Sequence, residues 1–197
     1  EYSMSSILKV DQLQDSGGNA IITSNGSGTI TVNNQTFKNG ITMVDRWRLT
    51  TDKLLTSTSS TDLTSNLERN DTTGFGRIGT GMTESSGIFT FPSTGIYLIE
   101  SNLNFLLNDS SKWILNEIKK TLDDSSYTLH AYNYQFISQT NSSNTYAVSV
   151  VSALLDVTDT SLVKVKFSQA RYNGNVNVRG DTTADTSFFT FTRLGDT

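Results

Sequence analysis

Residues 87–107, GIFTFPSTGIYLIESNLNFLL, constrain the fold more than any other stretch, because two alternating segments meet there at the only proline of the chain. Pro92 lacks a backbone N–H and restricts Phe91 to extended conformations, so one continuous strand cannot pass through this point. Gly95 can take the positive φ that a tight turn requires. Beyond the turn, apolar or small side chains recur at every second position, which predicts a long strand in a β sandwich with one wet face. The predicted buried face is Tyr97, Ile99, Ser101, Leu103, Phe105 and Leu107.

The same residues resemble a family signature. Residues 87–97, GIFTFPSTGIY, are similar to the G-x-F-T-x-P-x-x-G-x-Y motif of the tumour necrosis factor/complement C1q superfamily. The resemblance implies a ten-stranded jelly-roll head that assembles as a homotrimer; an unrelated β sandwich is the alternative. We therefore expect an all-β, antiparallel jelly-roll domain over residues 41–197, preceded by a small β meander. The strand–turn–strand that carries the resemblance is Gly87, Phe89, Phe91, Pro92, Gly95 and Tyr97.

Composition narrows the classes of partner and of chemistry. Charged residues make up 17% of the 197 residues, and the formal net charge is −4. Nucleic-acid binding needs a basic surface, so we expect none. No apolar run is long enough to cross a bilayer, so we expect no membrane insertion. The absence of cysteine excludes a disulfide framework, a Cys-based zinc site and a thiol nucleophile, and it favours a bacterial or viral source.

Residues 4–40 form the first predicted domain, in which short alternating segments are separated by glycine-rich turns. So small a meander is marginal by itself and must dock on something larger. Residues 8–22, LKVDQLQDSGGNAII, resemble the leader segments (LKVDxLQDxxGNxxI) of marine phage virion proteins. The resemblance implies a module that attaches the protein to other virion proteins; a flexible linker is the alternative. Residues 1–3 precede Met4 and could be an expression remnant or a product of precursor cleavage.

Several segments of the second domain carry aromatic or apolar faces. Residues 127–137 place His130 and three aromatic rings on one face, which favours a core or a subunit interface over a sugar-binding platform. Residues 145–155 are apolar on both faces, which predicts a strand inside a sheet that is itself covered. Under the family resemblance, neighbouring subunits would provide that cover. The candidates for core or trimer interface are Tyr97, Phe105, Tyr132, Tyr134, Phe136, Tyr146, Val148, Phe188 and Phe191.

Three other segments have competing interpretations. Residues 112–120 fit helical and strand spacing equally, and the family resemblance favours a strand. Trp47 lies between two arginines, as a sugar-binding ring can, but a core position is favoured. In the last segment, Phe188 and Phe191 match the phenylalanines of the family's final strand, whereas Thr190 replaces its usual glycine.

The polar loop 170–185 is the candidate ligand-binding loop. Its candidate residues are Arg171, Tyr172, Arg179 and Asp181. Calcium is considered because Asp181 and Asp185 offer hard oxygen ligands, but solvated loop charge is favoured and no cofactor is expected.

The sequence contains only weak matches to catalytic and cofactor-binding motifs. Residues 74–79 spell G-x-G-x-x-G, but a dinucleotide fingerprint needs a buried strand before it and a helix after it, and the flanking residues are polar. His130 is the only histidine, so any Ser-His-Asp triad would have to use it, and no serine motif lies nearby. We therefore expect a protein that is not an enzyme.

The leading hypothesis is a bacteriophage virion structural protein on the extracellular particle. The head would form a trimeric fibre or spike and contact a host-surface glycan or protein through its loops. A capsid decoration or cement trimer without host contact is the alternative within the same class. The alternative of another class is a surface-glycan hydrolase, whose two carboxylates the sequence does not place.

Overall fold

The computed structural model describes residues 10, 12–27, 30–32, 40–107, 111–138 and 144–197. The chain divides into two compact units, residues 1–40 and 41–197. In the first, β1 (Gln12–Gln14), β2 (Ala20–Ser24) and β3 (Ile30–Val32) form an antiparallel meander. Residues 4–9 of the predicted first domain lie outside the described residues, and an attachment role for this unit stays a prediction.

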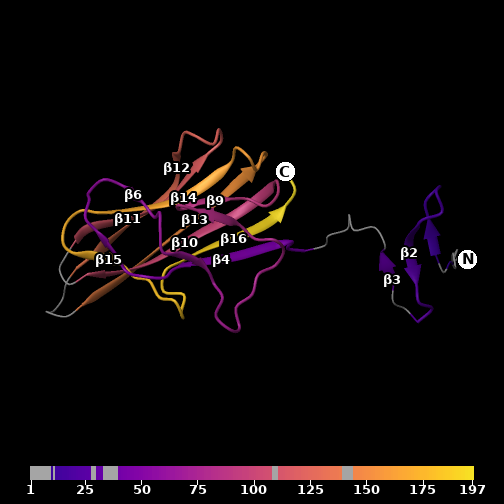
Figure 1. The fold of residues 1–197 in the computed structure, drawn as a ribbon, viewed down its shortest axis with the longest axis horizontal. Helices are drawn as coiled ribbons and strands as arrows, with labels where there is room; N and C mark the ends of the chain where they lie inside the picture. The colour runs from indigo at the N-terminus through magenta and orange to yellow at the C-terminus, as the bar shows by residue number, and fades with distance from the viewer. Residues whose placement is uncertain (1–9, 11, 28–29, 33–39, 108–110, 139–143) are drawn as a thin grey trace, which may run out of the picture. The chain divides into compact units, whose positions relative to one another are not determined.

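The second unit is a sandwich of two antiparallel sheets (Figure 1). The seven-stranded sheet has the order β5-β15-β10-β16-β4-β7, and β13 pairs with β10; the six-stranded sheet has the order β12-β11-β14-β9-β8, and β6 pairs with β14. The prediction of an all-β jelly-roll sandwich is confirmed. Its strands are β4 (Met43–Leu49), β5 (Lys53–Leu55), β6 (Thr61–Asp62), β7 (Leu67–Arg69), β8 (Thr83–Ser85), β9 (Ile88–Thr90), β10 (Gly95–Leu107), β11 (Ser111–Thr121), β12 (Thr128–Ile137), β13 (Thr145–Val157), β14 (Lys164–Arg171), β15 (Val176–Val178) and β16 (Phe188–Gly195).

The proline segment is where the chain crosses from one sheet to the other. Strand β9 belongs to the six-stranded sheet and β10 to the seven-stranded sheet, with Pro92 between them. The hydroxyl of Tyr97 donates to the carbonyl oxygen of Ser93 at 2.8 Å, which ties the strand to its own turn. Before β9, Ser86 and Gly87 have φ values of 52° and 82°, which is the two-residue turn that matches hairpin twist.

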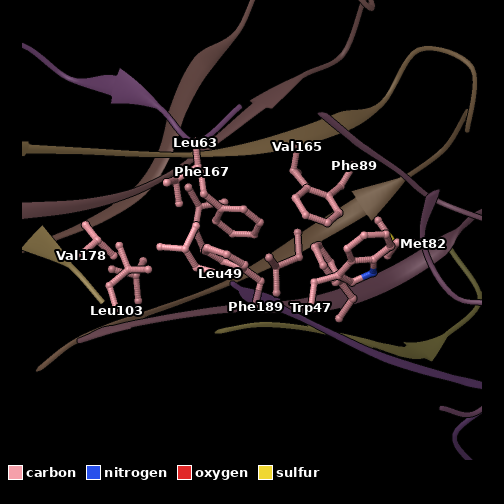
Figure 2. Packing of buried hydrophobic residues seen from close by; sticks show 14 of the residues in the cluster. Trp47, Leu49, Leu63, Met82, Phe89, Leu103, Val165, Phe167, Val178 and Phe189 are labelled. Carbon is pink, nitrogen blue, oxygen red and sulfur yellow. The ribbon is translucent and has the colours of Figure 1, made fainter. Parts of the chain in front are cut away.

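Aromatic side chains from both sheets fill the space between them (Figure 2). Phe167 of β14 stacks on Phe189 of β16 with ring centroids 4.1 Å apart, and Trp47 of β4 meets Phe89 edge-on at 5.5 Å. On β10, the alternate residues from Tyr97 to Leu107 are all buried, as the sequence pattern predicts. The core therefore brings together strands from the beginning and the end of the second unit's sequence.

A buried amide links the two sheets through polar contacts. Asn116 of β11 is fully buried and donates to the carbonyl oxygens of Ser101 (3.2 Å) and Ser149 (3.0 Å). Its own carbonyl oxygen accepts from the Ser101 hydroxyl at 2.8 Å. Because buried polar groups must be paired, this contact fixes β11 against β10 and β13 in one register.

The structure corrects two predictions and settles a third. Strand β13 is not inside a sheet: it pairs only with β10 among the described strands, and one of its faces is exposed. In β16 the core residues are Phe189 and Phe191, because neighbours in a strand face opposite sides, and Phe188 is half-buried on the outer face. Residues 112–120 lie in strand β11. The described part of the chain contains no helix that could span a membrane.

Candidate interaction surface

The most distinctive surface lies where the last strands of the two sheets meet. Strand β12 ends the six-stranded sheet and β13 ends the seven-stranded sheet. The Nε2 atom of His130 lies 2.8 Å from the carbonyl oxygen of Leu154, and the Asn133 amide donates to the carbonyl oxygen of Val150 at 3.3 Å. These contacts close the sandwich at this side, and β12 and β13 together are called the closed edge below.

Strand β12 presents a row of aromatic rings to the outside. Tyr132 and Tyr134 stand opposite Glu117 and Leu115 in the register, on the side of β11 away from the core residues Ile114 and Ile118. About half of the surface of each tyrosine is exposed, and Phe136 is 61% exposed. The predicted core position of these three rings is therefore wrong for a single chain, which leaves a subunit interface, the favoured interpretation, and a sugar-binding platform.

The rings of β12 are held in place by edge-to-face contacts. Tyr134 lies between Tyr132, at a centroid distance of 5.5 Å, and Trp113 of β11, at 5.4 Å. Trp113 also meets Tyr172 at 5.8 Å. Such pairs restrict the rotamers of exposed rings, so the row is organised before any partner binds.

Strand β13 presents a second apolar row on the outer face of the other sheet. Its side chains alternate, with Val151 and Leu155 in the core and the intervening residues outside. The row continues onto β10, where Leu98 and Leu106 pair with members of it. The exposed apolar residues of β13 are Tyr146, Val148, Val150 and Leu154, each 50–59% exposed.

Charge is nearly absent from the closed edge, where Asp156 near the end of β13 is the one Asp, Glu, Lys or Arg residue. Residues 128–137 contain His130 but no Asp, Glu, Lys or Arg, and residues 144–155 contain none of these four either. Edge strands of monomeric proteins are commonly protected by lysine, proline or inward-pointing charge. An edge with so little charge and with apolar side chains on both sides is typical of a surface that another protein covers.

Three other predicted candidates are ordinary core residues. Tyr97, Phe105 and Phe191 are fully buried between the sheets. Phe188 instead lies on the outer face beneath the Arg46 guanidinium, 4.5 Å from the ring centroid.

The candidate ligand-loop residues do not form one site. Arg171 donates to the carbonyl oxygen of Leu55 at 2.8 Å, and Arg179 lies 5.7 Å from the ring centroid of Tyr146, beside the closed edge. The Asp181 carboxylate accepts from the backbone N–H and the hydroxyl of Thr183 and from the backbone N–H of Ala184. These hydrogen bonds, the Thr183 N–H first, lower the pKa of Asp181.

The residues considered for metal or dinucleotide binding do not form such a site. Asp185 binds Arg46 at 3.1 Å and accepts from the Asn70 amide, and no three His, Cys, Asp or Glu side chains within the described residues gather as metal ligands. The G-x-G-x-x-G residues lie in the loop between β7 and β8, with no helix after them.

Sequence inspection missed part of the closed edge. Leu129, Val150 and Leu154 are as exposed as the predicted interface residues. The period-two alternation of residues 145–157 marks Val150 and Leu154 once β13 is known to be an edge strand, but it does not reveal which strand is an edge.

Comparison with known proteins identifies the fold. No protein-family model matches the sequence, and no curated protein matches it. Among solved structures, murine APRIL aligns with a TM-score of 0.55 at 13% identity over 77% of this chain and 98% of its own. Eiger TNF from S. frugiperda aligns with a TM-score of 0.56 at 13% identity, over 78% of this chain and 93% of its own.

A third solved structure with this fold is a vertex protein. PRD1 vertex protein P5 aligns with a TM-score of 0.51 at 16% identity, over 79% of this chain and 99% of its own. These identities show the fold alone. The second unit of this chain is therefore a tumour necrosis factor-like jelly-roll head, a fold that it shares with APRIL, Eiger and a vertex protein.

Proposed function

We propose that the protein is a non-enzymatic structural protein of a bacteriophage particle, in which three copies of the head assemble through the closed edge. The observation that carries the proposal is the pair of edge strands β12 and β13, which have apolar side chains on both sides and Asp156 as their one Asp, Glu, Lys or Arg residue. A trimer would remove this surface from water, and its aromatic composition is that of protein interfaces rather than of solvated strands.

A threefold ring explains why the apolar surface has two sides. In a ring, each copy presents one patch and receives a different one, and the rotation closes after three copies. The closed edge of one copy would insert against the outer face of the seven-stranded sheet of the next, where Leu98 and Leu106 of β10 extend the apolar row. Each copy would then cover its neighbour.

Size exclusion with light scattering tests the assembly. A trimer gives about 65 kDa, three times the chain mass of 21.6 kDa. Val150→Glu places a carboxylate in the centre of the proposed interface, and burying an unpaired charge costs more than the interface can offset, so we expect a monomer. Leu162→Glu, at a similarly exposed apolar residue in the turn before β14, is the matched control and keeps the wild-type mass. A monomeric wild type would overturn the proposal.

The particle role is supported by two independent likenesses. PRD1 vertex protein P5 shares the fold of the head. The first unit carries the leader-like sequence and forms only a three-stranded sheet whose described β1 residues are exposed, so it has little core of its own. We infer that this unit docks on other proteins of the particle while the head projects and meets a host-surface glycan or protein.

Particles that lack the protein separate the host-contact role from a cement role. A host-contacting head predicts particles that remain intact but adsorb poorly, with adsorption restored by adding the full chain. A decoration or cement protein, which the likeness to a vertex protein also favours, predicts normal adsorption and earlier disruption on heating. Loss of neither property would contradict both roles.

A further inference from the structure

A cavity beside β4 and β7 is independent of the closed edge. It has a volume of about 390 Å³, within the range of small-molecule sites. Strands β4 and β7 are three and four strand positions away from β13, at the opposite end of the seven-stranded sheet. Its lining consists of Val44, Asp45, Arg46, Arg69, Asn70, Phe75, Gly76 and Arg77.

Two of the three arginines in the cavity are already paired. The Nε atom of Arg69 donates to both carboxylate oxygens of Asp45, at 2.9 and 3.1 Å. Arg46 binds Asp185 at 3.1 Å and donates from Nε to the Thr190 hydroxyl. Both arginines stay partly exposed, with side-chain exposures of 33% for Arg69 and 39% for Arg46. Each of these pairs is close to neutral, so neither repels an anion strongly.

Arg77 is the uncompensated charge of the cavity. It is exposed and has no ion pair or hydrogen bond to any residue that the structure describes. Its guanidinium presents the planar fork that matches a carboxylate in two parallel hydrogen bonds. The single unpaired charge, in a cavity that buried Asp45 also lines, suits a monoanion better than a doubly charged phosphate.

The wall that carries Arg77 is fixed to the sheet. Val44 and Ile78 exchange backbone hydrogen bonds of 2.9 and 3.1 Å, and the Phe75 N–H donates to the carbonyl oxygen of Thr72 at 3.0 Å. Phe75 lines the cavity and is 45% exposed as a residue. An exposed ring in a pre-formed cavity offers a flat apolar surface to the C–H face of a sugar.

We propose that this cavity binds an acidic sugar of the hexuronate class, with Arg77 holding the carboxylate and Phe75 stacking on the ring. Asn70, whose amide donates to the Asp185 carboxylate, also lines the cavity. The site does not depend on the trimer, and the mass measured by light scattering on the same samples shows whether assembly fails separately.

Titration of the full chain with sodium glucuronate, followed by amide NMR at low salt, tests the site. We expect saturable shifts at Gly76 and Arg77, no saturation with glucose, which has the same ring without the carboxylate, and much weaker binding of acetate. Arg77→Gln should raise the dissociation constant for glucuronate at least tenfold, because losing a hydrogen bond to a charged group changes a binding constant by more than one order of magnitude. Lys120→Gln removes the same charge from β11 of the other sheet and leaves binding unchanged.

Phe75→Ala separates a sugar site from a simple anion site. It should weaken glucuronate binding and leave the weak acetate binding as it was. Both residues are exposed, so both variants should keep the wild-type melting temperature, which serves as the folding control. Equal binding of glucose and glucuronate, equal affinity in wild type and Arg77→Gln, or no saturable binding of glucuronate would each overturn the proposal.

Discussion

Replacing Gly87 with alanine tests why a glycine opens the signature segment. A Cβ atom at this position would lie 1.9 Å from the carbonyl oxygen of Leu63 and 2.9 Å from the Cα of Thr64, while φ is +82°. Both neighbouring atoms are backbone, so no side-chain rotation relieves the overlap. The segment that holds Leu63 would have to move outward, yet Leu63 is 1% exposed and its N–H donates to the carbonyl oxygen of Phe167 at 2.8 Å.

The expected loss is the sum of two separate costs. A non-glycine residue in the left-handed region costs about 1–2 kcal/mol. Displacing Leu63 forfeits burial worth about 1.5–3 kcal/mol. We therefore expect Gly87→Ala to lower the free energy of unfolding by about 2.5–5 kcal/mol and the melting temperature by roughly 5–20 °C for a domain of this size.

Two other glycines provide matched controls. Gly74 has φ +98° and no atom within 4 Å of the place that a Cβ atom would take, so Gly74→Ala isolates the backbone cost of about 1–2 kcal/mol. Gly180 has no positive φ, but its Cβ would lie 2.3 Å from the Thr51 nitrogen, so Gly180→Ala isolates the overlap. Thermal unfolding of all four proteins at one concentration compares them, because assembly makes stability depend on concentration. Equal losses for Gly87→Ala and Gly74→Ala would refute the steric explanation.

Other side chains give sharp expectations. Asn116→Ala leaves two buried carbonyl oxygens and one hydroxyl without their partner, so it should lower the free energy of unfolding in urea by about 2–4 kcal/mol. Asn144→Ala, at an exposed asparagine, should change this free energy by less than about 0.5 kcal/mol. Equal losses in the two variants would contradict the role of Asn116 in linking the sheets. Burial raises the pKa of Asp62, but hydrogen bonds from Lys166 and Ser168 and the charges of Lys166 and Lys119 outweigh it and lower the pKa overall. A carboxyl with a lowered folded-state pKa stabilises fully above its unfolded value, near 4, and this stabilisation is lost as pH falls through the folded value. Asp62→Asn should therefore flatten the decline in melting temperature below about pH 4, and an unchanged acid profile would contradict this.

The sequence predicts where the strands of the head lie better than it predicts which strands pair with one another. The alternation in β10 is unambiguous because apolar residues on one side face the core along the whole strand. Residues 145–155 are equally apolar, but two apolar faces are compatible with a central strand and with an edge that another chain covers. Only the pairing, which joins residues far apart in sequence, distinguishes the two.

Sequence patterns do not reveal which polar residues are buried. Arg48 looks like a surface residue by alternation, yet it is fully buried because Glu68, Asp71 and Asn70 surround its guanidinium. A buried charge is tolerated only with such partners, and they come from a different segment. The same limit applies to Phe188 and Phe189, where a shift of one position exchanges the core and outer faces.

The position of β16 in the seven-stranded sheet has a consequence for how the head is made. Strand β16 lies between β4 and β10, and it brings Phe189 and Phe191 into the core. Residues 188–195 leave the ribosome after every other strand that the structure describes, roughly 7–28 s after β4 at ordinary rates of synthesis. Until then β4 and β10 have a gap between them, and Trp47 and Leu49 lack their final neighbours. The seven-stranded sheet therefore cannot be completed until residues 188–195 have been synthesised, and the unfinished core stays open during that interval.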